Sequence, residues 1–179
     1  MPSAQVLAPV TLILGGARSG KSRYAESLVE SQPGAWIYVA TAEPGDDEMA
    51  ARIRAHQVRR GNRWTTIEAP LDLAGALRRA ASAEGAVLVD CLTLWLSNLI
   101  AAGHDIEAET AGLTAVLSEL AGPVVLVSNE VGLGIVPDNP LARRFRDQAG
   151  LLHQAIAAVA PSVVWVAAGL PLHLKSQAA

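Results

Sequence analysis

Cysteine and aromatic residues are scarce in this sequence, and neither sign of charge dominates. The 179 residues include one cysteine, Cys91, and only 4% aromatic side chains. A single thiol cannot form an internal disulfide, and no cluster of ligands has the spacing of a zinc site, so we expect a reducing, cytoplasmic location. The formal charge of −3 and the lack of long basic runs give no indication of nucleic-acid binding.

Segments with the character of a secretory signal or a membrane span are also lacking. Residues 1–14 contain no lysine or arginine, so they lack the charged front of a secretory signal. Residues 155–172 carry no charge, but Pro161, Ser162 and Pro171 interrupt them. This pattern favours a helix followed by a buried strand, and we expect no membrane insertion.

Hydrophobic residues are abundant, at 51% of the chain, and they suit one compact domain over residues 1–179. Short β-branched runs alternate with longer helical patterns, which is typical of an α/β fold with a mostly parallel sheet and flanking helices. The strands contain little polar alternation, so we expect helices on both faces of the sheet. The predicted strands are 10–14, 36–40, 64–67, 87–89, 124–128 and 163–166.

The predicted helices follow from apolar spacing and from capping residues. One begins near Lys21 and stops before Pro33, and another begins with Asn139 as the N-cap and Pro140 in its first turn. Four more are predicted at 46–60, 71–82, 92–102 and 106–120. The expected buried face of the last helix consists of Leu141, Phe145, Ala149, Leu152, Ile156 and Val159.

A phosphate-binding motif, G-x-x-x-x-G-K-[ST], lies between the first predicted strand and the first predicted helix. Its glycines let backbone N–H groups turn toward phosphate, and the helix N-terminus favours an anion. Lys21 is predicted to reach the β and γ phosphates and Ser22 to ligate Mg²⁺. A glycine-rich turn with an incidental lysine is the alternative. The motif consists of Gly15, Gly16, Ala17, Arg18, Ser19, Gly20, Lys21 and Ser22.

Asp90 directly follows the apolar run 87–89. A phosphate-binding loop needs an acidic partner for its metal at the end of another buried strand. Asp90 is therefore predicted to hold Mg²⁺ directly or through water. The alternative is that Asp90 caps the following helix.

His56 shares one face of a predicted helix with Met49, Ile53 and Arg60. Neighbouring cations disfavour a protonated imidazole, so more of the ring would stay neutral and nucleophilic. From spacing alone, a packed or solvated histidine is the alternative. The arginines near it in sequence are Arg52, Arg59, Arg60 and Arg63.

Other polar residues follow predicted strands, where open parallel sheets bind their ligands. Residues 129–137 form a loop with two glycines and several apolar residues, and they either line a pocket for a large, partly apolar substrate or pack over the core. The arginines that follow it either meet phosphate or are solvated. The residues in question are Thr41, Ala42, Glu43, Glu68, Asn129 and Glu130, and the arginines are Arg143, Arg144 and Arg146.

Three blocks of the sequence, in order over nearly the whole chain, resemble the bifunctional adenosylcobinamide kinase / adenosylcobinamide-phosphate guanylyltransferase family of cobalamin biosynthesis. The blocks are residues 15–23, residues 47–56, and residues 129–137 with Ala142, Arg143, Phe145, Arg146 and Asp147. The resemblance implies a RecA-like P-loop NTPase fold and a homotrimer. The phosphate-binding motif is shared with many enzymes, whereas the other two blocks are more specific.

The resemblance also implies two reactions. ATP or GTP would phosphorylate adenosylcobinamide, and GMP would then pass from GTP, through a guanylylated His56, to adenosylcobinamide phosphate. Guanine preference rests on the resemblance, since the sequence lacks an N-K-x-D element. The implied nucleotide contacts are Gly15 to Ser22, Thr41, Ala42, Glu43, Gln57, Val58, Arg59, Arg60, Glu68 and Asp90. The resemblance is weak at 103–109 and after Leu170, so no function is assigned there.

Two other functions remain open on the residues alone. In a monofunctional small-molecule P-loop kinase, Lys21 and Asp90 would act and His56 would be structural. In a nucleotide-dependent binding module, the phosphate loop would switch conformation without turnover on cobinamide. A covalent nucleotide adduct on the protein is expected for the bifunctional enzyme and for neither of these two alternatives.

Overall fold

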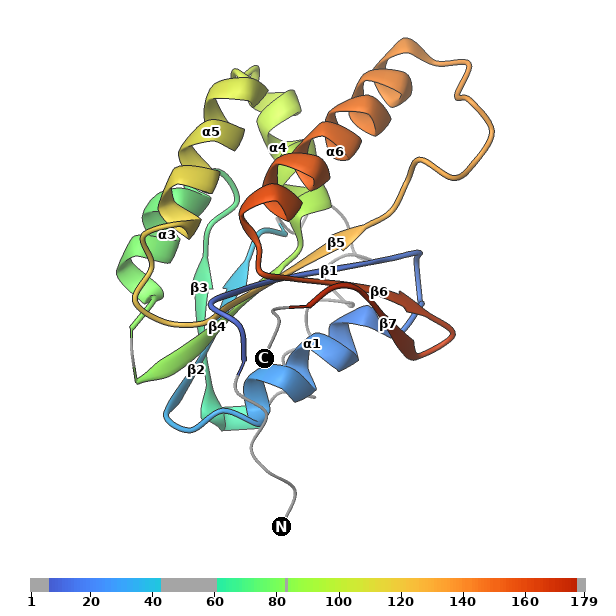
Figure 1. Cartoon of the computed structure of the whole chain (residues 1–179). Helices are drawn as coiled ribbons and strands as arrows, with labels where there is room; N and C mark the ends of the chain where they lie inside the picture. The colour runs from blue at the N-terminus through green and yellow to red at the C-terminus, as the bar shows by residue number, and fades with distance from the viewer. Residues whose placement is uncertain (1–6, 43–60, 83, 177–179) are drawn as a thin grey trace.

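The computed structural model describes residues 7–42, 61–82 and 84–176 (Figure 1). A seven-stranded sheet runs through the centre in the order β3-β2-β4-β5-β1-β6-β7. All neighbouring strands pair in parallel except β7, which runs antiparallel to β6. The strands are β1 (Val10–Gly15), β2 (Ala35–Ala40), β3 (Trp64–Glu68), β4 (Gly85–Asp90), β5 (Val124–Asn129), β6 (Ser162–Ala167) and β7 (Leu170–Lys175).

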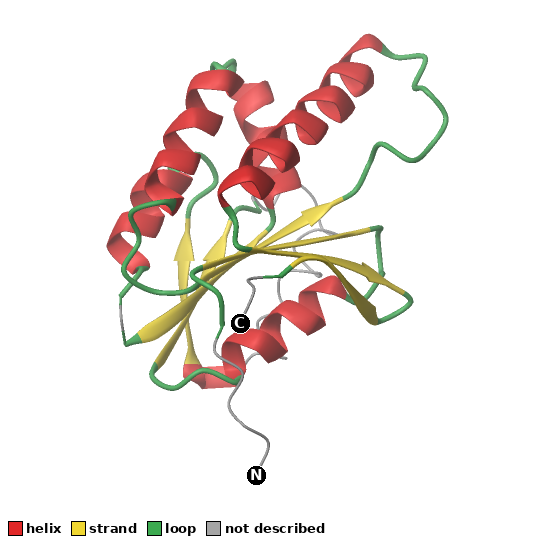
Figure 2. Ribbon diagram, in the orientation of Figure 1, coloured by secondary structure: helices red, strands yellow, loops and turns green. Residues whose placement is uncertain are grey.

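Helices cover both faces of this sheet, as the apolar strands predict (Figure 2). One face carries α1 (Lys21–Glu30), and a short 3-10 helix (Gly61–Arg63) precedes β3. The other face carries α3 (Leu73–Ala80), α4 (Leu92–Ala102), α5 (Ile106–Leu117) and α6 (Pro140–Val159). No helix in the described ranges is long and apolar enough to cross a membrane.

Neighbouring residues of a strand enter different halves of the core. In β1, Leu12 packs with α3 to α6, whereas Ile13 packs with α1, and both are fully buried. Burying a side chain of this size stabilises the fold by about 1.5–3 kcal/mol. The central strands are thus held on both faces, which fixes the positions of their carboxyl ends.

Helix α6 confirms one local prediction and corrects another. Asn139 is its N-cap, because the side-chain oxygen accepts hydrogen bonds from the N–H groups of Leu141 and Ala142. The predicted buried face is too long: Leu141 is 58% exposed and Val159 is 37% exposed. Both lie at the ends of α6, and its N-terminal end extends away from the sheet (Figure 1).

Other boundaries differ by a few residues from the prediction. The helix predicted at 71–82 begins after Asp72, whose side chain accepts a hydrogen bond from the Gly75 N–H, so α3 starts at Leu73 rather than at Leu71. The predicted helix 46–60 lies outside the described residues. Strand β7 is an addition to the predicted strands, which end at residue 166.

Topology brings several strand ends together. Strand β1 lies between β5 and β6, and β5 separates it from β4. The carboxyl ends of β2, β4, β5 and β1 therefore meet at one edge of the sheet, where parallel α/β proteins bind ligands.

Candidate functional site

The loop between β1 and α1 has the tight backbone that the glycine motif predicts. Arg18 has φ 57° and Gly20 has φ 97°, and the Ser19 N–H donates to the Gly16 carbonyl at 3.2 Å. A side chain at Gly15 would collide with the carbonyl oxygen of Val166. Because glycine alone tolerates this approach, the loop can wrap closely around an anion.

Lys21 is held over this loop. Its side chain is buried, and Nζ donates a hydrogen bond to the Gly16 carbonyl at 3.1 Å. Burial lowers the pKa of Lys21, and the nearby carboxylate of Asp90 partly opposes that shift. The predicted cation and the predicted carboxylate are therefore close enough to interact.

The turn between β6 and β7 supports the same loop, and no motif in the sequence predicts this contact. The Gly169 N–H donates to the Ser19 carbonyl at 2.8 Å. A Cβ atom on Gly20 would lie 3.0 Å from the Gly169 Cα. Ala168 and Gly169 both have positive φ, as in a two-residue hairpin turn. The hairpin thus packs its turn directly against the phosphate loop.

A buried network joins the ends of β2 and β4. Thr41 Oγ1 donates to the Cys91 carbonyl at 2.7 Å and accepts from the Cys91 N–H at 2.9 Å. Asn98 Nδ2 donates to the carbonyls of Thr41, at 2.8 Å, and Pro70, at 3.1 Å. Helix α4 therefore ties together the segments that follow β2 and β3.

The same helix reaches the end of β5. Thr93 Oγ1 accepts a hydrogen bond from Asn129 Nδ2 at 3.0 Å and lies 3.1 Å from Cys91 Sγ. Cys91, and not Asp90, is the N-cap residue of α4, and no side-chain cap bond forms there. The alternative interpretation of Asp90 as a helix cap is therefore wrong.

His153, on α6, is a buried histidine. Its Nε2 lies 2.7 Å from Ser128 Oγ, and its Nδ1 lies 3.8 Å from Glu130 Oε2. Burial lowers the pKa of His153, and the charge of Glu130 opposes this shift in part. The Ser128 side chain is fully buried, so the group links α6 to β5 without access for a substrate.

The loop after β5 does not pack over the core. Leu133 is 81% exposed and Ile135 is 97% exposed, and the chain extends away from the sheet here (Figure 1). Arg143 is engaged by the Pro137 carbonyl, to which its Nη1 donates at 2.8 Å. Arg146 pairs with Asp147 at 2.8 Å. The packed alternative for residues 129–137 is therefore wrong.

The described part of the chain contains some of the predicted site residues and not others. Gly15 to Ser22, Thr41, Ala42 and Asp90 lie together at the carboxyl edge of the sheet. Glu68 is exposed at the end of the edge strand β3, with β2, β4 and β5 between it and β1. Glu43, His56, Gln57, Val58, Arg59 and Arg60 lie outside the described residues.

The donors available for a metal ion are an alcohol and a carboxylate. Ser22 is half-buried in the first turn of α1, and Asp90 lies near Lys21. Mg²⁺ prefers oxygen ligands and in nucleotide sites takes one or two from protein and the rest from phosphate and water, so this pair fits. Over the described ranges, no group of three or more His, Cys, Asp or Glu side chains could hold a metal.

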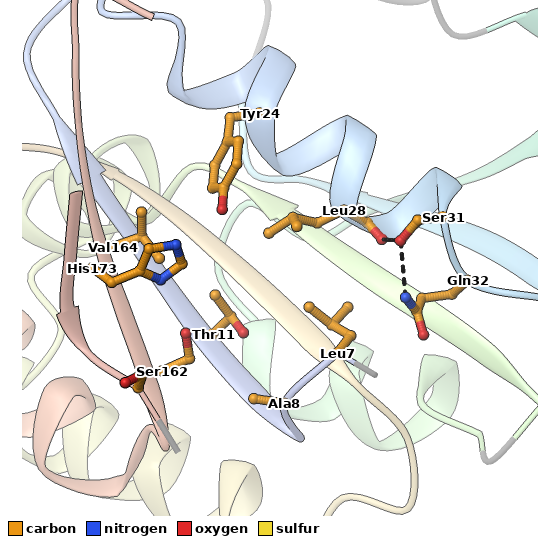
Figure 3. Close-up of a pocket in the computed structure, with 11 residues that line it drawn as sticks. Leu7, Ala8, Thr11, Tyr24, Leu28, Ser31, Gln32, Ser162, Val164 and His173 are labelled. Atoms are coloured by element: carbon orange, nitrogen blue, oxygen red, sulfur yellow. Dashed lines mark hydrogen bonds between the residues drawn. The ribbon is translucent and has the colours of Figure 1, made fainter. Parts of the chain in front are cut away.

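A pocket of about 160 Å³ lies elsewhere, between α1 and the strands β1, β6 and β7 (Figure 3). Tyr24, Thr11, Ser162 and His173 are among its lining residues. Thr11 and Ser162 pair near the starts of β1 and β6, so the pocket is toward the opposite end of the strands from Gly15. It is separate from the phosphate loop.

The site combines a phosphate loop after β1, a lysine over that loop and an acidic residue at the end of β4, which β5 separates from β1. This arrangement defines a P-loop nucleotide-binding protein with RecA-like topology. Solved structures agree on the fold. An ATPase of a bacterial type III secretion system superposes with a TM-score of 0.58 at 10% identity, covering 97% of this chain and 59% of that chain. A Pyrococcus horikoshii protein gives 0.55 at 10% identity, covering 95% and 88%.

Sequence comparison shows the family. Residues 11–174 match the family described as cobinamide kinase / cobinamide phosphate guanyltransferase, and the chain belongs to it. A relative from Pseudomonas aeruginosa, named bifunctional adenosylcobalamin biosynthesis protein CobP, is 51% identical over 93% of this chain and 97% of its own. One from Salmonella typhimurium, named bifunctional adenosylcobalamin biosynthesis protein CobU, is 40% identical over 92% and 98%.

Proposed function

We propose that this chain catalyses two consecutive reactions of adenosylcobalamin biosynthesis. It phosphorylates adenosylcobinamide with ATP or GTP, and it then transfers GMP from GTP to adenosylcobinamide phosphate to give adenosylcobinamide-GDP. The observation that carries the proposal is the phosphate loop with Lys21 bonded to Gly16 and electrostatically coupled to Asp90, within a family match over residues 11–174.

In the kinase step, the terminal hydroxyl of the aminopropanol arm attacks the γ-phosphorus, and the nucleoside diphosphate leaves. Lys21 and the N–H groups of the loop stabilise the charge on the phosphates. Ser19 Oγ, which is buried and has no partner within the described ranges, can donate to a phosphate oxygen. Ser22 and Asp90 would hold Mg²⁺, which neutralises phosphate charge when bound.

In the transferase step, His56 attacks the α-phosphorus of GTP and pyrophosphate leaves. The phosphate oxygen of adenosylcobinamide phosphate then attacks the same phosphorus and releases the histidine. A covalent intermediate of this kind divides one difficult displacement into two. The predicted contacts at Glu43, Gln57, Val58, Arg59, Arg60 and Glu68 remain part of this proposal, as does assembly into a homotrimer.

Labelling with GTP that carries ³²P at the α-phosphate tests the covalent step. We expect an adduct that is stable to alkali and labile to acid, as a phosphoramidate is. His56→Ala should abolish the adduct and retain the kinase reaction. Lys21→Ala should lower kinase turnover by about 100-fold or more, because the residue stabilises charge in the transition state.

Normal labelling of the His56→Ala variant would show that another residue is the nucleophile. Kinase activity with no adduct in the unmodified protein would favour the monofunctional kinase. Tight nucleotide binding with no turnover on adenosylcobinamide would favour the binding module.

A further inference from the structure

The hydroxyl of Thr41 makes two hydrogen bonds to one neighbour, Cys91, and its only donor is used. The side chain is 0% exposed, and its single O–H donates to the Cys91 carbonyl while its oxygen accepts from the Cys91 N–H. The two bonds, at 2.7 and 2.9 Å, have ordinary lengths for strong hydrogen bonds. A nucleotide contact from this hydroxyl would have to break the bond to the carbonyl and leave a buried acceptor unsatisfied.

These bonds lie directly beside Asp90. Ala40 pairs with Asp90 where β2 and β4 end, so Thr41 and Cys91 are each the next residue. The Thr41 side chain therefore continues the pairing of the two strands by one residue, where the backbone ladder has stopped. It fixes the main chain on the carboxyl side of Asp90.

Thr41 is itself held in place. Asn98 on α4 donates one hydrogen bond to the Thr41 carbonyl and another to the Pro70 carbonyl. On the opposite side of Cys91, Thr93 contacts the thiol and accepts hydrogen bonds from Asn129 at the end of β5. The residue after Asp90 is thus connected to β2 through Thr41 and to β5 through Thr93.

We propose that Thr41 is a positioning residue, which holds the Asp90 carboxylate in register with Lys21 and the phosphate loop, and that its side chain does not bind nucleotide. This inference rests on the proposed role of Asp90 in the kinase step. The geometry of Asp90 matters because a misplacement of about 1 Å in a catalytic group can cost about 100-fold in rate.

The test compares Thr41→Val, which keeps the shape and removes the hydroxyl, with Thr41→Ser, which keeps the hydroxyl. Kinase turnover is measured over a series of Mg²⁺ and ATP concentrations, with adenosylcobinamide as acceptor. For Thr41→Val we expect kcat to fall about tenfold or more and the half-saturating Mg²⁺ concentration to rise severalfold, with KM for ATP changed less than about twofold. Thr41→Ser should restore most of the activity.

Two further variants keep the result interpretable. Thr66→Val removes an exposed threonine hydroxyl on β3 and should behave as the unmodified protein does. Asn98→Leu leaves Thr41 intact and removes its support, so it should shift kcat and the Mg²⁺ requirement in the same direction as Thr41→Val. Thermal melting of each variant identifies any that fail to fold, and Asn98→Leu then stands in for Thr41→Val.

Three outcomes would overturn the inference. A raised KM for ATP with unchanged kcat and Mg²⁺ requirement in Thr41→Val would show a nucleotide contact. If kcat and the half-saturating Mg²⁺ concentration are unchanged in both Thr41→Val and Asn98→Leu, Asp90 needs no such support. If Asp90→Asn itself leaves the Mg²⁺ requirement unchanged, the proposed role of Asp90 is wrong, and the inference fails with it.

Discussion

At the scale of single residues, His153 shows how burial couples ionisation to stability. The imidazole is enclosed between Ser128 and Glu130, and burial lowers its pKa. A histidine in the unfolded chain titrates near pH 6.5. The folded protein disfavours the charged ring. The contribution of neutral His153 to the free energy of unfolding is therefore complete above about pH 6.5, and it is lost as the pH falls from that value toward the lowered pKa.

We therefore predict that the free energy of unfolding falls between pH 7.5 and pH 5, in part because of His153. The measurement is urea denaturation at several pH values. His153→Gln should be less stable by about 1 kcal/mol at pH 7.5, since the hydrogen bond to Ser128 is weakened, but should show a flatter pH profile. His104→Gln, which alters a half-buried pair with Glu109, is the control. Equal pH profiles for His153→Gln and the unmodified protein would contradict the prediction.

The sequence predicts residues whose role is local more readily than those whose role depends on distant contacts. The loop from Gly15 to Ser22 is recognisable because its function follows from eight consecutive residues. Thr41 and Cys91 are 50 positions apart, and Ser128 and His153 are 25 apart. No periodicity or spacing predicts such hydrogen bonds, because they depend on which strands become neighbours in the folded sheet.

At the scale of secondary structure, the β6–β7 hairpin combines a turn and a support for the phosphate loop. Gly169 has φ 79°, and its N–H donates to Ser19. We predict that Gly169→Ala lowers the free energy of unfolding by about 1 kcal/mol because of backbone strain. It should also weaken nucleotide binding severalfold, because relief of this strain would move the N–H of residue 169 away from the Ser19 carbonyl. Urea denaturation and nucleotide titration measure the two effects.

Gly103 offers a matched control for this prediction. It has φ 72° at the end of α4, and a Cβ atom there would meet nothing within 4 Å, as is also true at Gly169. Gly103→Ala should cost similar stability and leave nucleotide affinity unchanged. Equal nucleotide affinities for the two variants would show that the hairpin turn does not support the loop.

The sequence predicts six of the seven strands. Five of them are mostly buried and apolar, whereas β3 is mostly exposed and is predicted from its aromatic and β-branched residues. Strand β7 is exposed along its whole length and contains Pro171, so it gives no such run. A weaker signal was present, since Leu170, Leu172 and Leu174 alternate with other residues and follow Gly169. Alternation of this kind indicates an edge strand.

At the scale of the whole molecule, apolar side chains remain exposed along one edge of the sheet. Leu170, Leu172 and Leu174 are 72%, 60% and 58% exposed, and alternation places them on one face of β7. An exposed apolar edge strand favours contact with another chain. For the proposed homotrimer we predict a mass in solution of about three times 18.6 kDa by light scattering.

Leu172→Glu should lower that mass, because a charge would enter the apolar face of β7. Leu151→Glu, at a side chain 55% exposed on α6, is the control and should retain the mass of the unmodified protein. A monomeric unmodified protein would contradict the trimer. An unchanged mass for Leu172→Glu would place the contact between copies elsewhere.

The position of β1 between β5 and β6 has a consequence for biosynthesis of the chain. Strand β1 is synthesised well before residues 124–129 and 162–167, which form its two partner strands. Non-local pairing of this kind is slow to form, and an incomplete chain exposes unpaired apolar strands. A nascent chain halted before Gly169 would carry the whole glycine motif and yet lack the turn that supports it, so the phosphate loop gains its full support only after residue 169 has been synthesised.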